Sequence, residues 1–228
     1  MILPGHAAYY LEIFSLPGFL ADPLLVFGVQ DILKPTRSRR AARAFTPFDD
    51  LGGYLRSRGL GQVVTMDCFD PRADLHYDFN QPVPAHEHGR DATLIDVGCL
   101  EHVFDSRQCL ENCLRLVRPG GHFLLHTPVK GYYGHGLHTF DPEGLRGALE
   151  LNGFQVVYLK YSTKSGRDVA SPGGFDDVLI WLVGRKIAEF DRFTSPQQAR
   201  WTRGYPTSRV PDSYARRAGL ALRRWLGR

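Results

Sequence analysis

The sequence predicts an α/β protein: a doubly wound, mostly parallel seven-stranded sheet that closes with a final antiparallel hairpin. Two observations lead to this prediction. From residue 23 onward, short apolar runs alternate with segments of helical periodicity, which is typical of a parallel sheet covered by helices. The last two apolar runs, 155–161 and 177–183, are joined by a polar stretch too short for a helical crossover, so we expect them to be antiparallel.

The first half of the chain supplies one helix and most of the strands. Residues 7–15 are expected to form a short helix, because Pro17 and Gly18 follow as breakers. Residues 23–28 are an apolar run closed by glycine, as in a buried strand of a parallel sheet. After a helix-like segment at 48–61, three further strands are expected at 62–67, 74–79 and 92–97.

The second half alternates in the same way. Residues 101–117 carry apolar side chains at roughly helical spacing, and the breakers at 118–121 end this predicted helix before a fifth strand at 122–126. Asp141 and Pro142 are residue types favoured at the N-cap and the first position of a helix. That helix is expected to run to Asn152.

Composition excludes several classes of protein. Hydrophobic residues make up 43% of the 228 residues and charged residues 23%, so the chain can form a packed core. No stretch approaches the roughly 20 apolar residues of a membrane-spanning helix, and the start lacks the features of a secretory signal. The 4 cysteines show no C-x-x-C pair and no zinc-ligand spacing, which indicates reduced thiols in a cytoplasmic protein.

Positive charge is concentrated at the C-terminal end. Residues 191–228 contain nine arginines, no lysine and two aspartates, a formal charge of +7, whereas nineteen basic and twenty-two acidic residues leave the remainder at −3. We therefore divide the chain into a domain at 1–190 and a basic extension at 191–228. Residues 212–226 have the pattern of an amphipathic helix, which we expect to pack on the domain or a partner enzyme, or to lie on an anionic membrane.

One long segment carries a resemblance to a known family. Residues 92–128, ATLIDVGCLEHVFDSRQCLENCLRLVRPGGHFLLHTP, resemble the fourth strand, the Leu-Glu-His-Val helix start and the Pro-Gly-Gly turn of the class I S-adenosylmethionine-dependent methyltransferases. The likeness covers about residues 22–185. It implies a Rossmann-like methyltransferase domain over 1–190 that uses S-adenosylmethionine as its cofactor.

A narrower likeness concerns the first motif of that family. The segments DLHYDFNQPVP and GHGLHTFDPEGL resemble a bacterial subgroup in which a Gly-x-Gln turn replaces the first glycine-rich motif. Here Gly28, Val29 and Gln30 occupy that place. Because Val29 is β-branched where a flexible residue is usual, either Gln30 and Asp31 supply side-chain contacts or cofactor binding is weakened or lost.

Acidic residues end three of the predicted parallel strands. Gly28, Asp67, Asp78 and Asp96 are expected at one edge of the sheet, where open α/β sheets bind ligands. Carboxylates there suit the ribose diol and cationic groups of S-adenosylmethionine, and the lack of Gly-x-Gly-x-x-Gly counts against a dinucleotide. Asp67 is expected to accept hydrogen bonds from both ribose hydroxyls, the alternative being a strand-end turn.

The remaining cofactor contacts follow from the same edge. Gly28 would permit close backbone approach, and Asp78 and Phe79 would flank the adenine, unless Phe79 is a core residue and Asp78 caps a turn. His102 either packs beneath the cofactor or satisfies a backbone carbonyl. The complete predicted cofactor set is Phe27, Gly28, Gln30, Asp67, Asp78, Phe79, Asp96, Val97 and Gly98.

The loop at 130–140 follows the fifth strand and is rich in glycine, tyrosine and histidine. An oxygen acceptor needs a base, so His135 first and His138 second are the predicted catalytic residues, the alternative being that both only fix loop geometry. Glu101 opens the predicted helix at 101–117, and the helix dipole by itself favours an acidic residue at that position. The spacings His135-x-x-His138 and His86-x-His88 are weak metal signals, and no metal is predicted.

These observations together predict methyl transfer from S-adenosylmethionine to a small-molecule or glycan acceptor, with oxygen favoured as the acceptor atom. The alternative is a catalytically inactive scaffold that docks through the basic extension. A nucleic-acid substrate is disfavoured, because no Asn/Asp-Pro-Pro-Tyr/Phe motif follows the fourth strand and the positive charge lies outside the predicted crevice.

Overall fold

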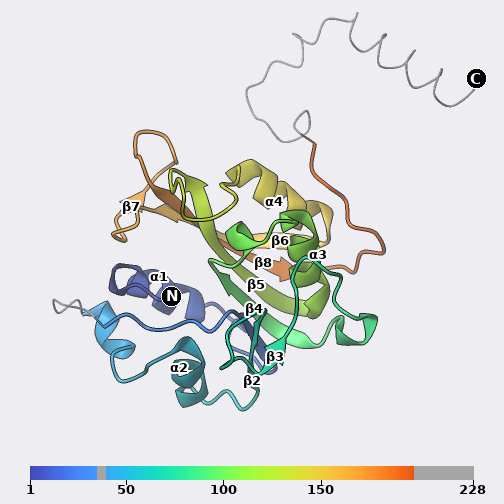
Figure 1. The fold of residues 1–228 in the computed structure, drawn as a ribbon, viewed down its shortest axis with the longest axis horizontal. Helices are drawn as coiled ribbons and strands as arrows, with labels where there is room; N and C mark the ends of the chain where they lie inside the picture. Colours follow the sequence, from blue (N-terminus) through green and yellow to red (C-terminus); the bar gives the residue numbers. More distant parts are fainter. Residues whose placement is uncertain (35–39, 198–228) are drawn as a thin grey trace, which may run out of the picture. The chain divides into compact units, whose positions relative to one another are not determined.

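The computed structural model describes residues 1–34 and 40–197, and residues 1–195 form one compact unit. The described strands build a single mixed sheet in the order β3-β2-β1-β4-β5-β8-β6-β7 (Figure 1). They are β1 Leu24–Phe27, β2 Val63–Asp67, β3 Leu75–His76, β4 Asp91–Val97, β5 Val117–Lys130, β6 Phe154–Ser162, β7 Asp168–Val169 and β8 Val178–Lys186. The predicted amphipathic helix at 212–226 lies outside the described residues, and the domain division at 190 stays a prediction.

Helices cover both faces of the sheet (Figure 1). Helices α1 (Ala7–Phe14) and α2 (Leu51–Ser57) share an apolar cluster on one face, and α3 (Ser106–Leu116) and α4 (Pro142–Leu151) share a second cluster on the other. The described 3-10 turns are η1 Pro4–His6, η2 Ala41–Ala44, η3 Ala85–Glu87 and η4 Leu100–His102. In the described ranges, no helix combines the length and apolar character needed to cross a membrane.

The strand pairing confirms the predicted fold class. Strand β1 pairs in parallel with β2 and β4, and β4 pairs in parallel with β5. Strand β8 pairs antiparallel with both β5 and β6, which confirms the antiparallel hairpin that the short polar connection predicts. The helices on both faces complete a doubly wound α/β arrangement.

The register of the parallel strands decides which residues meet at the ligand-binding edge. Phe27 lies opposite Met66 on β2 and Asp96 on β4. Val97 lies opposite His126 on β5. Because the carboxyl ends of parallel strands reach the same edge, the residues that follow these positions converge there, as the sequence predicts.

Two predicted elements are wrong in their extent. The third strand is expected over 74–79 but comprises only Leu75–His76. The helix expected over 101–117 is split into η4 and α3, and α3 begins at Ser106. The cause is Asp105, whose Oδ1 accepts a hydrogen bond from the Gln108 backbone N at 2.9 Å and so caps the helix at that point.

Two further differences add strand residues. Strand β5 begins at Val117 and includes the predicted breakers. An added Cβ on Gly121 would lie 2.6 Å from the Ala92 carbonyl oxygen, so glycine here permits close approach to β4. The stretch between the last two predicted strands also contains the two-residue edge strand β7, where Tyr161 pairs with Val169. The sheet therefore has eight described strands instead of the predicted seven.

A buried asparagine joins α3 to the segment that follows β3. The Asn112 side chain is fully buried, and its Oδ1 accepts from the Val83 backbone N at 3.1 Å. Its Nδ2 donates to the carbonyl oxygens of Phe79 at 3.2 Å and Gln81 at 2.8 Å. One side chain thus satisfies three backbone groups of a segment without regular structure, which fixes that segment beside the sheet.

We expect Asn112→Ala to lower the free energy of unfolding by roughly 2–4 kcal/mol, because it leaves buried backbone groups without partners and opens a small cavity. Urea denaturation monitored by circular dichroism measures this change. Gln108→Ala is the control: it removes a half-buried side chain that donates only one hydrogen bond, to Asn112 at 3.0 Å. Equal stability of the Asn112→Ala variant and the parent chain would contradict the proposed role.

Candidate functional site

A pocket of about 320 Å³ lies at the carboxyl ends of β4 and β5. The ends of the two strands, η4 and the loop after β5 form one part of its wall, and the first residues of the chain form another. Lys164, from the connection between β6 and β7, also reaches it. The lining residues are Met1, Leu3, His6, Val97, Gly98, Glu101, His102, His126, Tyr132, His135, Lys164 and Leu179.

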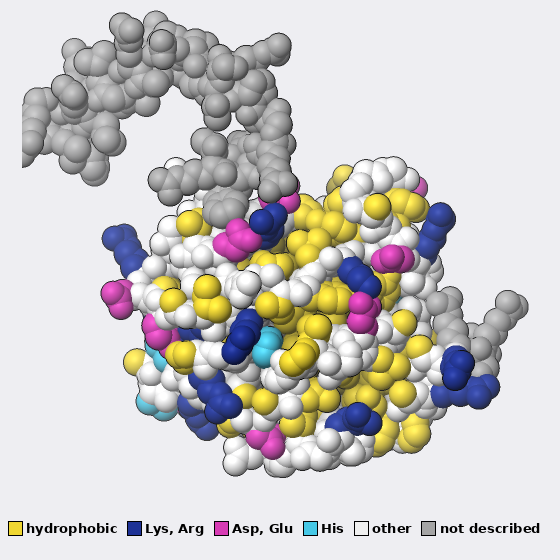
Figure 2. All heavy atoms as spheres, turned by 180° about the vertical axis from the view of Figure 1, so that it is seen from behind, with side chains coloured by type: hydrophobic (Ala, Val, Ile, Leu, Met, Phe, Trp, Pro, Cys, Tyr) yellow, Lys and Arg dark blue, Asp and Glu magenta, His cyan; other side chains and the backbone are white. Residues whose placement is uncertain are grey.

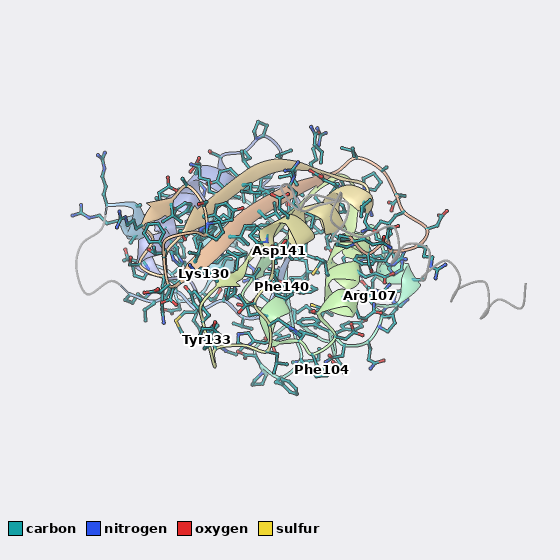
Figure 3. All side chains as sticks on the ribbon, turned by 90° about the horizontal axis from the view of Figure 1, so that it is seen from above. Phe104, Arg107, Lys130, Tyr133, Phe140 and Asp141 are labelled. Carbon is teal, nitrogen blue, oxygen red and sulfur yellow. The ribbon has the colours of Figure 1, made fainter. Side chains whose placement is uncertain are left out.

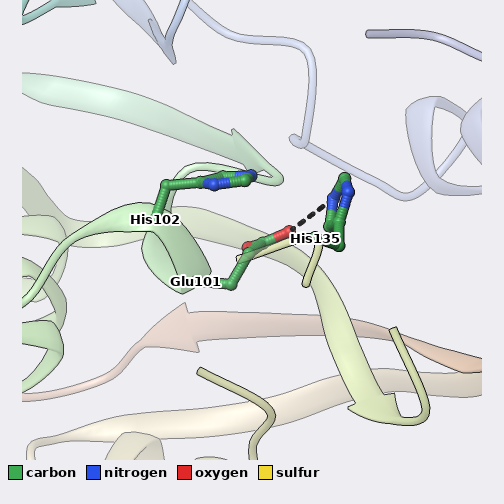
Figure 4. Close-up of side chains that lie close together, drawn as sticks. All are labelled: Glu101, His102 and His135. Carbon is green, nitrogen blue, oxygen red and sulfur yellow. Dashed lines mark ion pairs between the residues drawn. The ribbon is translucent and has the colours of Figure 1, made fainter. Parts of the chain in front are cut away.

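A buried carboxylate lies in the wall of this pocket. The Glu101 side chain is only 3% exposed, and its Oε2 accepts a hydrogen bond from Thr127 Oγ1 at 2.8 Å. Its Oε1 lies 4.0 Å from His135 Nε2, a pair that Figure 4 marks with a dashed line. Burial raises the pKa of Glu101, and the Thr127 hydrogen bond and the nearby His135 oppose that shift.

The backbone of Glu101 also holds the loop after β5. Its carbonyl oxygen accepts from the backbone N of Leu137 at 2.7 Å and of His138 at 3.1 Å. An added Cβ on Gly136 would lie 2.9 Å from the same oxygen, so only glycine lets the loop come this close. These contacts bring His135 to the pocket.

Two imidazoles face the carboxylate. The rings of His102 and His135 lie 5.1 Å apart between centroids, and their nitrogens and a Glu101 oxygen form a group within 4.8 Å of one another (Figure 4). The carboxylate is buried, whereas both histidines are exposed. Partial burial lowers the pKa of His102, which favours its neutral form.

Asp96 supports the turn that carries these groups. Its fully buried carboxylate accepts from the backbone N of Cys99 at 2.8 Å and of Leu100 at 3.2 Å. Burial and, to a smaller extent, the nearby Glu101 charge raise the pKa of Asp96 to about 8, while the two backbone hydrogen bonds oppose the shift. Asp96 therefore fixes the backbone at the start of η4 by hydrogen bonds. Val97 and Gly98, which were predicted with it, line the pocket directly.

The predicted cofactor edge centres on Gly28, whose backbone has a φ of +74°. An added Cβ there would lie 2.9 Å from Gln30 Nε2, 3.0 Å from Cys99 Sγ and 3.5 Å from Asp67 Oδ2. Asp67 Oδ1 accepts from the backbone N of Phe69 at 2.8 Å. The structure thus brings the Asp67 carboxylate and the Gln30 amide together at Gly28.

The Gln30 side chain is buried at this edge. It is 4% exposed, and its Nε2 donates to the Phe27 carbonyl oxygen at 2.9 Å. Its Oε1 accepts from the amino group of Met1. Gln30 therefore occupies the space above Gly28 in the described structure and ties the first residue of the chain to β1.

The predicted adenine contacts lie in two different environments. Phe79 is buried and stacks on Phe27, with ring centroids 4.4 Å apart and an interplanar angle of 4°. Both rings belong to the apolar cluster below the sheet edge, so neither lines the pocket. Asp78 is exposed, and its Oδ1 accepts from the Asn80 backbone N at 3.0 Å.

The structure places the two predicted catalytic histidines in different surroundings. His135 lines the pocket, whereas the His138 ring lies 3.1 Å from the Phe104 carbonyl oxygen and is not among the lining residues. Tyr132, which was not singled out within the predicted loop, also lines the pocket. It adopts a φ of 62°, and its buried Oη has no hydrogen-bond partner within the described part of the chain. Lys164 and the first residues of the chain were also missed, because they reach the pocket only through the tertiary fold.

Comparison with solved structures identifies the fold. A SAM-dependent methyltransferase from Archaeoglobus fulgidus superposes with a TM-score of 0.51 at 11% sequence identity, covering 80% of this chain and 92% of that one. An S-adenosylmethionine-dependent methyltransferase from Mesorhizobium loti gives 0.50 at 12% identity, covering 78% and 98%. The chain therefore has the fold of the class I S-adenosylmethionine-dependent methyltransferases, as the resemblance implies.

Sequence comparison gives a partial relative. A protein of Mycolicibacterium smegmatis that bears the name "Probable S-adenosylmethionine-dependent methyltransferase" is 30% identical over 95 residues. The match covers 38% of this chain and 37% of the relative, so it spans a little over a third of that protein's length. No family model matches the sequence.

The raised pKa of Asp96 has a consequence for stability. A carboxyl group whose pKa is about 8 in the folded state, against about 4 when unfolded, binds its proton more tightly in the fold. Its contribution to stability is full below about pH 4 and is lost as the pH rises through about 8. We expect Tm to fall between pH 5.5 and 8.5, and to fall by less in Asp96→Asn.

Differential scanning fluorimetry across this range measures the effect. Asp49→Asn is the control, because the Asp49 side chain is 97% exposed and should leave the pH slope unchanged. The same slope in Asp96→Asn as in the parent chain would contradict the assignment.

Proposed function

We propose that this protein transfers a methyl group from S-adenosylmethionine to an oxygen atom of a small-molecule or glycan acceptor. The observation that carries this proposal is that the predicted cofactor edge and the pocket lie next to each other. The pocket begins at Gly98, and the next residue, Cys99, reaches within 3.0 Å of the Cβ position of Gly28, beside the Asp67 carboxylate. A cofactor edge and a lined pocket therefore adjoin at the carboxyl ends of the parallel strands.

The residues at this edge suit the cofactor. Asp67 Oδ1 is engaged by the Phe69 and Asp70 backbone N–H groups, while Oδ2 accepts no hydrogen bond from the described residues and points toward Gly28. A half-buried carboxylate with an open oxygen can accept from a ribose diol. The Gln30 amide would hydrogen-bond the cofactor above Gly28, and Val97 and Gly98 would contact its methionine end. When bound, S-adenosylmethionine supplies a methyl group on a sulfonium, an activated leaving group.

The chain's own residues then position the acceptor and move its proton. Proximity and alignment supply most of the rate in such a displacement. His135 reaches the pocket from the loop after β5, and its Nε2 lies 4.0 Å from Glu101 Oε1. With a neutral imidazole, His135 can accept the hydroxyl proton as the oxygen attacks, and the adjacent carboxylate stabilises the imidazolium that results.

Exposed aromatic side chains near the pocket favour a glycan or another ring-bearing acceptor. The Phe104 side chain is 82% exposed and Tyr133 is 100% exposed. Figure 3 shows both on the same side of the unit, Tyr133 from the loop after β5 and Phe104 from the segment between η4 and α3. Tyr133 follows the lining residue Tyr132 directly, and Phe104 lies two residues after the lining residue His102. Exposed aromatic faces of this kind stack on sugar rings and other flat apolar ligands.

The alternative function is a scaffold without catalysis, and one observation favours it. The Gln30 side chain occupies the space above Gly28, where the cofactor backbone contacts are expected. A nucleic-acid substrate is less favoured, because the Lys and Arg side chains of described residues are spread among acidic and apolar ones on the face in Figure 2. The four free cysteines agree with the proposed cytoplasmic location.

Calorimetric titration with S-adenosylmethionine and S-adenosylhomocysteine separates the enzyme from the scaffold. We expect binding in the micromolar range, about −8 kcal/mol. Asp67→Ala should weaken it at least tenfold, because the ribose loses its acceptor. Asp70→Ala is the matched control, since its carboxylate pairs with Arg72 at 2.7 Å instead of facing Gly28. Failure to bind either ligand at millimolar concentration would replace the enzyme with the scaffold.

A second prediction concerns the base. With an acceptor found by screening glycans and small hydroxylated compounds for S-adenosylhomocysteine release, His135→Ala should lower kcat about 100-fold. Its affinity for S-adenosylmethionine should stay within about twofold, because His135 lies on the acceptor side. His86→Ala removes a histidine that is 75% exposed and remote from the pocket lining, and should leave kcat unchanged. An active His135→Ala enzyme would refute this assignment.

A further inference from the structure

We propose that Glu101, His102 and His135 bind one divalent transition-metal ion in the pocket. The three side chains each offer a ligand atom, and these atoms lie within 4.8 Å of one another (Figure 4). They come from two separate parts of the chain, η4 and the loop after β5, so the site exists only in the folded protein. Binding of the ion follows from these residues alone, whereas the role given to it below rests on the proposed function.

The geometry is close to that of an occupied site. Three atoms that are no more than 4.8 Å apart fit within a circle whose centre lies no more than about 2.8 Å from each of them. Metal–nitrogen and metal–oxygen bonds are about 2.0–2.2 Å. Each ligand atom therefore has to move by no more than about 0.6–0.8 Å, which a change of side-chain rotation supplies for the two exposed histidines.

The donor set selects the class of metal. Two imidazoles and one carboxylate suit divalent transition metals such as Zn²⁺, Fe²⁺, Co²⁺ and Mn²⁺. Mg²⁺ and Ca²⁺ instead prefer all-oxygen sites. Three protein ligands with an open side are typical of catalytic metal sites, because water or substrate completes the coordination. Here the open side is the pocket, since both histidines are exposed.

The surroundings of the carboxylate fit a ligand. Thr127 Oγ1 donates to Glu101 Oε2 at 2.8 Å, which leaves Oε1 to face His135. Such an outer hydrogen bond orients a coordinating carboxylate. Tyr132 gives a second observation in favour of a bound ion. This residue lines the same pocket, and its buried Oη has no hydrogen-bond partner among the described residues. A water molecule on the ion would supply one.

The ion would change how the acceptor loses its proton. A hydroxyl oxygen bound to a divalent ion has a lowered pKa, so its proton can pass to water in the open pocket before the oxygen attacks the methyl carbon. One O–H bond breaks and one O–C bond forms, and the methyl leaves the sulfonium with the electron pair of the S–C bond remaining on sulfur. With the ion bound, His135 would hold the metal and the ion would activate the hydroxyl, whereas the role of His135 as base applies to the metal-free protein.

The test is metal binding by chelator-treated protein in the absence of S-adenosylmethionine. We expect calorimetry to show one equivalent of Zn²⁺ bound with micromolar or tighter affinity, and Co²⁺ to develop visible d–d absorption on binding. Glu101→Gln, His102→Ala and His135→Ala should each weaken Zn²⁺ binding at least tenfold. His86→Ala is the matched control for an exposed histidine outside the cluster and should bind like the parent chain.

Two results would overturn the proposal. One is no saturable Zn²⁺ or Co²⁺ binding by the parent chain. The other is loss of binding in His86→Ala together with retention in His135→Ala, which would place the ion on the surface. His135→Ala alters an exposed loop side chain, and circular dichroism confirms that the variant is folded before it is titrated. Because cofactor titration is a separate measurement, failed cofactor binding with intact metal binding would refute the proposed function and leave the metal site standing.

Discussion

The arrangement of the pocket depends on the burial of the Glu101 carboxylate at the end of β4. A buried carboxylate requires hydrogen-bond donors, and Thr127 supplies one from β5. The backbone of the same residue receives the Leu137 and His138 N–H groups, so the loop after β5 cannot move without breaking contacts to η4. One residue thus couples two strand ends and places His135 opposite the carboxylate.

Asp96 fixes the turn that positions Glu101. Its buried carboxylate accepts two backbone N–H groups from the turn that leads to Glu101. The two acids lie close enough for the charge of Glu101 to raise the pKa of Asp96. Burial raises the pKa of both carboxyl groups, and raised carboxyl pKa values of this kind cluster at functional sites. A cation between Glu101 and the histidines would relieve part of this repulsion.

The pocket side and the cofactor side of the site differ in what must move when a ligand binds. On the pocket side, the groups that would act on an acceptor lie on η4 and a glycine-rich loop, where small rotations change their spacing. On the cofactor side, Gln30 fills the space above Gly28, so ligand binding there requires that amide to exchange its hydrogen bond with the Phe27 carbonyl for one with the ligand. Cofactor affinity consequently depends on the cost of that exchange, which is about that of one hydrogen bond.

The sequence by itself determined the fold class, the antiparallel hairpin and the strand ends near Gly28, Asp67 and Asp96, because strand periodicity, breakers and connection length are local properties. It ranked His135 before His138 but gave no reason for only the first to line the pocket. These residues are three apart on a loop whose path depends on Gly134, with a φ of +74°, and on the approach of Gly136 to the Glu101 carbonyl.

Only the tertiary structure decided what completes the pocket. Lys164, Leu179 and the first residues of the chain have no shared pattern in the sequence, since they are brought together by the pairing of β8 with β5 and by the packing of the chain start beside β1. The same applies to the Phe27–Phe79 stack: an aromatic residue after a strand can face a ligand or the core, and the packing of α3 against the 79–83 segment turns Phe79 inward.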